Sequence, residues 1–126
     1  MSFIIDTSAW VEYLEGSNKG DKINHYVENE EIITPLIVVL ELSVKAEKEG
    51  WNMEKIYNFI KLKSSIVGFP ENEINLFGKI YVSARNKIPS FGMADAIILA
   101  TSKNLKSKII TTDHHFKEFE DIILIE

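Results

Sequence analysis

The sequence of 126 residues contains no cysteine. This absence excludes a disulfide framework, a zinc–cysteine site and thiol catalysis. The sequence also lacks a membrane-spanning stretch, because its longest apolar runs, LIVVL and AIILA, are far shorter than the span of a bilayer. Its start, MSFIID, has no basic region followed by a long apolar one, as a signal peptide would. We therefore expect a cytoplasmic protein that does not bind membranes.

Linker-like composition is absent as well. The chain has only 3 prolines and 6 glycines, and no segment rich in proline, glycine or serine divides it. It also has no internal repeat. A chain of this length can bury enough apolar surface to fold without disulfides or structural metal. We predict one domain over residues 1–126.

Positive charge is in short supply. Lysine and arginine number 14 against 19 aspartates and glutamates, which gives a formal net charge of -5. Because contacts to phosphate need Lys and Arg, this balance argues against nonspecific binding of nucleic acid. Any role with nucleic acid therefore needs a local basic patch or a bound cation. Arg85 and Lys87, just ahead of Asp95, are candidates for such a patch, although a solvated helix face would look the same.

Short apolar, β-branched runs alternate with segments of helical period. This alternation predicts βαβ units, and hence a three-layer α/β/α fold, rich in helix, with a short, mainly parallel five-stranded sheet. The expected strands are FIID, EEIIT, SSIVGF, KIITTD and DIILIE. The expected helices are SAWVEYLEG, KINHYVENE, MEKIYNFIKLK, NEINLFGKIYVSARNK, MADAIILATSKNLK and LIVVLELSVKAEKEG, with Pro35 as the first residue of the last.

Two acids follow expected strands directly. Asp6 ends FIID and Asp113 ends KIITTD, and ligands of parallel α/β sheets bind outside the carboxyl ends of the strands. Two further acids, Glu41 and Asp95, interrupt the apolar stretches LIVVLEL and MADAIILA. A carboxylate in an apolar stripe is costly unless a cation or hydrogen-bond donors compensate it. Together the four acids predict a site for Mg²⁺ or Mn²⁺, which prefer oxygen ligands.

Each acid taken alone also has a purely structural explanation. Asp6 can cap the following helix, and Asp113 can be a turn residue. Glu41 can pair with Lys45 at i,i+4, and Asp95 is a first-turn acid that the helix dipole favours. The joint placement of the four acids therefore carries the metal-site hypothesis.

Four motifs in order resemble PIN-domain ribonucleases, and among them the VapC toxins of prokaryotic toxin–antitoxin pairs. The motifs are IIDTSAWVEYLEG, TPLIVVLEL, MADAIILATSKNL and IITTDHHFKEF, and they cover nearly the whole chain. The resemblance implies a PIN-like fold and RNA phosphodiester hydrolysis with one or two Mg²⁺ or Mn²⁺ ions. It implies Asp6, Glu41, Asp95 and Asp113 as metal ligands and catalytic acids, with Ser8 and Thr111 holding them in place.

The resemblance also implies partners. An antitoxin and a homodimer are expected to use apolar surface of the helices at 21–30 and 36–49, beside which stand the aromatic residues Trp10, Tyr13, Tyr26 and Trp51. One departure from the family pattern is the pair His114–His115. Two adjacent histidines can indicate a metal ligand, but we expect an exposed turn.

Three other classes of protein share parts of this pattern. A phosphatase of the haloacid-dehalogenase type would need a second aspartate two residues after Asp6, where this chain has Ser8. A housekeeping PIN nuclease of RNA maturation would share every catalytic residue with a toxin. A non-catalytic module that binds RNA or a partner would also share the fold, but loss of an acid would favour it, and all four acids are present.

Overall fold

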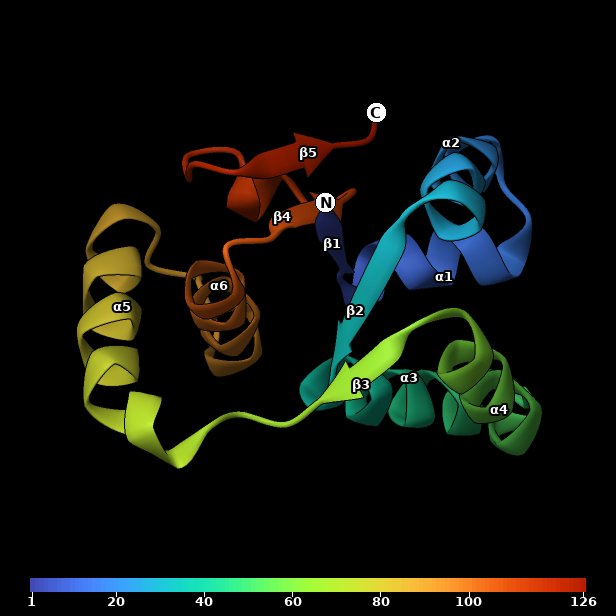
Figure 1. Cartoon of the computed structure of the whole chain (residues 1–126), viewed down its shortest axis with the longest axis horizontal. Coiled ribbons are helices and arrows are strands. Elements are labelled where there is room, and N and C mark those ends of the chain that lie inside the picture. The colour runs from blue at the N-terminus through green and yellow to red at the C-terminus, as the bar shows by residue number, and fades with distance from the viewer.

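The structure is a computed structural model that describes every residue, Met1–Glu126. Its centre is a five-stranded sheet of order β3-β2-β1-β4-β5, in which every neighbouring pair is parallel (Figure 1). The predicted five-stranded parallel sheet is therefore confirmed. The strands are β1 Ser2–Ile5, β2 Glu31–Pro35, β3 Ser65–Val67, β4 Lys108–Thr111 and β5 Ile122–Leu124.

Helices cover both faces of this sheet. Figure 1 shows α5 and α6 on one side and α1, α2 and α4 on the other, so the three-layer arrangement is confirmed as well. None of the helices has the length and hydrophobicity needed to cross a membrane. The α-helices are α1 Thr7–Glu15, α2 Asn18–Asn29, α3 Leu36–Glu49, α4 Met53–Lys63, α5 Ile74–Lys87 and α6 Met93–Leu105; two 3₁₀ turns, η1 Glu71–Glu73 and η2 His114–Phe116, complete the set.

Local sequence signals set most helix ends. Gly16 and Gly50 close α1 and α3 in the left-handed region, with φ of 70° and 72°, where glycine carries no steric cost. The helix α2 begins earlier than its apolar pattern predicts, because the Ser17 hydroxyl accepts a hydrogen bond from the Gly20 amide and caps the helix. Pro35 ends β2 and precedes α3, instead of being its first helical residue.

Three of the four aromatic residues expected beside the partner surface, Trp10, Tyr13 and Tyr26, lie in or against the core, whereas Trp51 is partly exposed. Trp10 is 0% exposed and donates its indole N–H to the Thr34 hydroxyl. Tyr13 and Tyr26 are partly buried and pack against the core. These three side chains face inward because α1 and α2 must cover β1 and β2. Trp10 is therefore not available to a partner, and a contact of Tyr13, Tyr26 or Trp51 with a partner stays a prediction. The exposed apolar side chains of α3 are Leu36, Leu40 and Val44, which are 46%, 53% and 54% exposed.

Candidate functional site

The two strand-end acids lie side by side. Strands β1 and β4 pair in parallel with Ile5 opposite Ile110, so the residues that follow them meet at the carboxyl edge of the sheet. Asp6 comes immediately after β1, and Asp113 comes two residues after β4. The negative charge of Asp113 contributes to the raised pKa of Asp6.

Asp6 is the most buried of the acids, at 3% exposure. Its Oδ1 accepts hydrogen bonds of 2.9 Å from both the Ser8 hydroxyl and the Ala9 amide, and its Oδ2 accepts one of 2.5 Å from the Thr111 hydroxyl. The bond from the Ala9 amide caps the N-terminus of α1, so the predicted role of Asp6 as a helix cap is confirmed. Capping accounts for one of these three bonds.

Ser8 and Thr111 link Asp6 to the segment that carries Asp113. The Thr112 amide donates to the Ser8 hydroxyl at 3.1 Å, and the Asp113 amide donates to the Thr111 hydroxyl at 2.9 Å. Each hydroxyl thus accepts a hydrogen bond from a backbone N–H and donates one to the Asp6 carboxylate. We call Asp6, Ser8 and Thr111 the buried centre. It fixes the start of α1 and the end of β4 relative to each other.

Burial raises the pKa of Asp6 from 3.8 to about 6, chiefly because the carboxylate is removed from water. The hydrogen bonds from Thr111, Ala9 and Ser8 oppose this shift but do not cancel it. Because burial makes the charged form of this carboxylate unfavourable, a cation bound close to it would stabilise that form.

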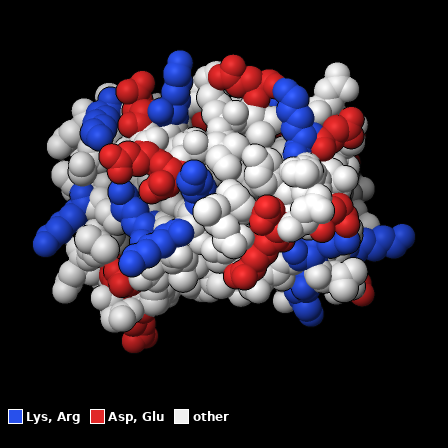
Figure 2. Space-filling model, turned by 45° about the horizontal axis from the view of Figure 1, so that its top comes forward, with Lys and Arg blue, Asp and Glu red and all other residues white.

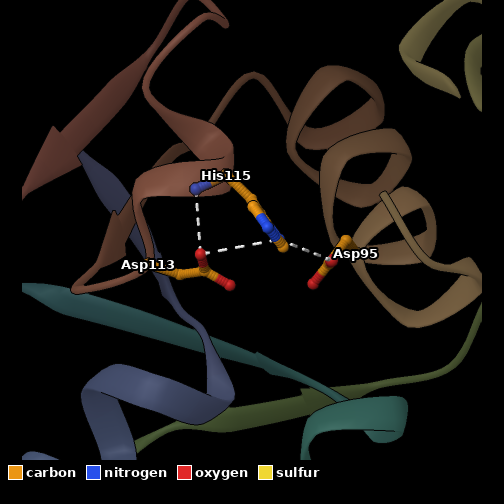
Figure 3. A group of neighbouring side chains, drawn as sticks. All are labelled: Asp95, Asp113 and His115. Carbon is orange, nitrogen blue, oxygen red and sulfur yellow. Dashed lines mark hydrogen bonds and ion pairs between the residues drawn. The ribbon is translucent and has the colours of Figure 1, made fainter. Parts of the chain in front are cut away.

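A second group of side chains lies beside the buried centre and is more exposed. Asp95, Asp113 and His115 each offer an atom within 4.8 Å of those of the other two (Figure 3). His115 Nδ1 is 3.7 Å from Asp113 Oδ1 and 4.0 Å from Asp95 Oδ2. The side chains are 26% exposed for Asp95, 35% for Asp113 and 44% for His115. We call these three residues the open cluster.

The open cluster is assembled from two segments that are distant in sequence. Asp95 stands in the first turn of α6, where its Oδ2 accepts from the Gly92 amide at 3.4 Å. Asp113 caps η2, and its Oδ1 accepts from the His115 amide at 2.9 Å. Asp95 and Asp113 therefore also have the capping or turn roles that the sequence allowed.

Glu41 approaches from α3. Its Oε1 accepts a hydrogen bond of 2.5 Å from the Thr7 hydroxyl at the start of α1. The alternative pairing with Lys45 is wrong, because Lys45 bonds Glu49 at 3.2 Å instead. This bond therefore holds Glu41 next to Thr7, the residue that follows Asp6.

The pKa of Asp95 shows that the acids act on one another. Burial raises this pKa most, and the negative charges of Asp113 and Glu41 raise it further, while His115 lowers it. Asp113 also raises the pKa of Asp6. The four acids predicted from sequence are thus electrostatically connected, although only Asp95 and Asp113 lie in the tight group with His115.

The sequence does not predict how close His115 lies to two acids. The pair His114–His115 forms a turn, as expected, and His114 is exposed. The His115 side chain is 44% exposed and lies beside Asp95 and Asp113. The neighbouring Phe116 is fully buried and holds the turn down. The sequence likewise does not predict the contact between Thr7 and Glu41. The only indication in the sequence of a histidine near the acids was the pair of adjacent histidines, which can indicate a metal ligand.

The two basic residues proposed for RNA lie on α5. Arg85 donates to the Tyr81 hydroxyl and to the Phe91 carbonyl, both at 3.1 Å, which places it near the turn that leads to Asp95. Lys87 lies 5.5 Å from the ring centre of Phe119, in a hollow that it shares with Lys79 and Lys103. Figure 2 shows basic and acidic side chains interspersed over the visible face, without one large area of positive charge.

The donor set fits a hard divalent cation. Carboxylate oxygens are the ligands that Mg²⁺ and Mn²⁺ prefer. In the structure no Lys or Arg forms an ion pair with Asp6, Glu41, Asp95 or Asp113, and His115 is the only ion-pair partner among them. Negative charge at this edge of the sheet is therefore not neutralised by any Lys or Arg of the chain.

The PIN-domain family profile matches residues 3–122, nearly the whole chain. This chain belongs to the PIN-domain family. The resemblance inferred from the four sequence motifs is thereby confirmed. PIN domains are generally nucleases. No curated protein gives a significant match to the sequence.

Several solved structures share the PIN fold over almost their full length. A chain of a toxin–antitoxin complex from Klebsiella pneumoniae is 18% identical, with a TM-score of 0.76 and 98% of each chain covered. A chain of VapBC2 from Rickettsia felis, bound to a promoter DNA fragment, is 19% identical, with a TM-score of 0.77 and coverage of 98% of this chain and 97% of that one. A chain of VapBC-1 from nontypeable Haemophilus influenzae is 20% identical, with a TM-score of 0.68 and coverage of 98% and 96%.

Proposed function

We propose that this PIN domain is a metal-dependent endoribonuclease, and that it is the toxin of a VapBC-type toxin–antitoxin pair. The observation that carries the proposal is the convergence of four acids at one edge of the sheet with no Lys or Arg to neutralise them. A fold alone would not need this arrangement, because uncompensated carboxylates near one another destabilise it.

Asp6, Glu41, Asp95 and Asp113 are assigned to hold one or two Mg²⁺ or Mn²⁺ ions, directly or through water. When bound, such ions polarise phosphate and activate water for attack on phosphorus. The protein's own task is to hold the acids still. Ser8 and Thr111 orient the Asp6 carboxylate, and Thr7 orients Glu41.

RNA binding is assigned to Arg85 and Lys87. Arg85 is anchored on the Phe91 carbonyl, beside the turn that leads into α6 and Asp95, so it suits a phosphate close to the scissile one. Lys87, with Lys79 and Lys103 around the same hollow, suits phosphates further along the strand. Contacts of this kind are salt-sensitive.

Partner binding is assigned to exposed apolar surface. One hollow is lined by Phe69, Ile74, Phe77, Met93 and Ile97, and a second, sharing Phe69 and Ile97, reaches α3 at Leu36 and Leu40. Apolar patches of this kind mark interaction sites. We assign this surface to an antitoxin and to a second copy of the chain, consistent with the toxin–antitoxin complexes that share the fold.

The nuclease proposal is tested by incubating the protein with defined RNAs, with Mg²⁺ or Mn²⁺ and with excess EDTA. We expect internal cleavage that needs the metal and leaves a 5′-phosphate and a 3′-hydroxyl. Cleavage that persists in excess chelator, or that leaves a 2′,3′-cyclic phosphate, would overturn the mechanism.

The toxin assignment is tested separately, by co-expression with the product of the neighbouring short reading frame. We expect a stable complex that suppresses cleavage, and a dimer in sedimentation at micromolar concentration. An active nuclease that stays monomeric and does not bind the product of the neighbouring reading frame would indicate the housekeeping alternative.

A further inference from the structure

His115 is the one residue of the open cluster that is not an acid, and it is held in a defined orientation. Its ring nitrogen Nε2 lies 3.2 Å from the Ser90 hydroxyl, and its Nδ1 faces Asp95 and Asp113 (Figure 3). When Nε2 carries the proton and donates it to Ser90, Nδ1 presents a lone pair to the two carboxylates.

Two buried aromatic rings keep this arrangement in place. Phe91, next to Ser90, and Phe116, next to His115, are both 0% exposed and pack edge to face with ring centres 5.6 Å apart. The Phe91 segment continues through Gly92 into the turn of α6 that bears Asp95. The packing of Phe91 against Phe116 thus brings the segment that carries Ser90 and Asp95 next to the one that carries His115.

We propose that His115 is a nitrogen ligand for the divalent ion at Asp95 and Asp113, oriented by Ser90, and that it makes the site prefer Mn²⁺ to Mg²⁺. This inference rests on the proposed metal-dependent nuclease function. Metal-bound histidine commonly uses its second ring nitrogen for a hydrogen bond that fixes the ring, and Ser90 supplies that partner. Imidazole is accepted by transition metals, whereas Mg²⁺ keeps to oxygen ligands and water.

The separations of His115 from the two acids suit a shared ion. Two atoms bound to one ion at about 2.1–2.2 Å can lie no more than roughly 4.3 Å apart. The distances from His115 Nδ1 to the two carboxylate oxygens, 3.7 Å and 4.0 Å, are within that limit. They are also too long for direct hydrogen bonds, so the imidazole does not already satisfy either acid.

A competing explanation makes the opposite prediction. His115 can instead serve as a positive charge that stands in for the metal between the two acids. In that case its removal would leave the acids more repulsive and would raise the affinity for every divalent ion. The two explanations therefore predict changes of opposite sign in Mn²⁺ affinity when His115 is removed.

The test measures metal binding rather than cleavage. Calorimetric titrations with Mn²⁺ and with Mg²⁺ compare wild type, His115→Gln and Ser90→Ala, with His114→Gln as the matched control at the exposed neighbouring histidine. We expect His115→Gln to weaken Mn²⁺ binding at least about tenfold and to change Mg²⁺ binding less than about threefold. Ser90→Ala should weaken Mn²⁺ binding by a smaller factor, and His114→Gln should match wild type.

Electron paramagnetic resonance of the Mn²⁺-loaded proteins provides a second reading, because a coordinated imidazole adds nitrogen modulation to the signal. This modulation should be present in wild type and absent in His115→Gln. Unchanged or tighter Mn²⁺ binding in His115→Gln would overturn the assignment while leaving the nuclease proposal intact. Wild-type protein that binds neither ion would overturn both. Thermal melts without metal exclude misfolding of a variant as the cause.

Discussion

The buried centre and the open cluster lie at the same edge of one sheet, yet they treat their carboxylates differently. Both oxygens of Asp6 are occupied by donors from the chain: Ser8, Ala9 and Thr111. In the open cluster, Asp95 Oδ1 and Asp113 Oδ2 accept no hydrogen bond from the protein. Asp6 is 3% exposed, whereas the side chain of Asp113 is 35% exposed.

This difference separates two tasks that one acidic site needs. A saturated, buried carboxylate stabilises the backbone around it and places negative charge where water cannot screen it. Partly exposed carboxylates with unused oxygens can bind an ion and release it. We therefore expect changes at the open cluster to act first on metal binding and cleavage, and changes at the buried centre to act first on folding.

The largest expected effect is loss of cleavage in Asp113→Asn. The amide removes a charge and a ligand oxygen but can still accept the bond from the His115 amide that caps η2. Cleavage of a defined RNA in Mn²⁺ should fall by at least about a thousandfold, which corresponds to roughly 4 kcal/mol of activation free energy. The melting temperature without metal should equal or exceed that of wild type, because repulsion with Asp6 and Asp95 is relieved.

The matched control for this variant is Asp121→Asn. Asp121 is exposed and has a positive φ of 58°, a conformation that asparagine tolerates well. It lies on the turn before β5, so its charge is changed outside the acid site. Full activity is expected there. An active Asp113→Asn protein would show that Asp113 is only a turn residue, and the distinction between the two groups of acids would fail.

The next effect concerns folding stability and comes from Asp6. Its carboxyl group has a pKa of about 6 in the folded protein against 3.8 as the ordinary value, so the folded state binds the proton more tightly. Stability linked to this group is therefore greatest below pH 4 and is lost as the pH rises through 6. The loss should amount to roughly 3 kcal/mol.

Urea unfolding at pH 4, 5, 6 and 7 in EDTA measures this loss, with Asp6→Asn as the reference. As the pH rises, the unfolding free energy of wild type should fall relative to that of Asp6→Asn. Saturating Mn²⁺ at pH 7 should stabilise wild type by about 2.7 kcal/mol at a hundredfold excess over Kd. A difference that stays constant with pH would mean that Asp6 is not the strained group of the site.

The sequence predicts some residues of the site but not others. Asp6 and Asp113 were predictable, because parallel strands bring the residues after their ends to one edge. The position of His115 was not, since it depends on Phe91 and Phe116 packing across 25 residues of chain. The bond from Thr7 to Glu41 likewise depends on how α1 and α3 are rotated about their axes. Periodicity fixes which face of a helix is buried, but not which polar side chains meet at its edge.

Thr111→Val should have a smaller effect than the pH change, and it tests the buried centre without altering charge. Valine keeps the shape of threonine in β4 but removes the donor to Asp6 Oδ2 and the acceptor of the Asp113 amide. Unfolding free energy at pH 7 should fall by about 1–3 kcal/mol. The fall should shrink near pH 4, where Asp6 is protonated. Thr111→Ser, which keeps the hydroxyl, is the matched control and should lose less.

The smallest stability effect is expected for Thr7→Val, which removes the donor to Glu41 Oε1. Both side chains are partly exposed, so water can replace the lost bond, and unfolding free energy should change by less than about 1 kcal/mol. Cleavage should nevertheless fall by roughly tenfold, because an orienting contact of a proposed ligand is lost. Thr7→Ser should restore most of the activity. If Thr7→Val instead destabilises the fold as much as Thr111→Val does, Glu41 belongs with Asp6 as a structural acid, and the division between the buried and the exposed carboxylates must be redrawn.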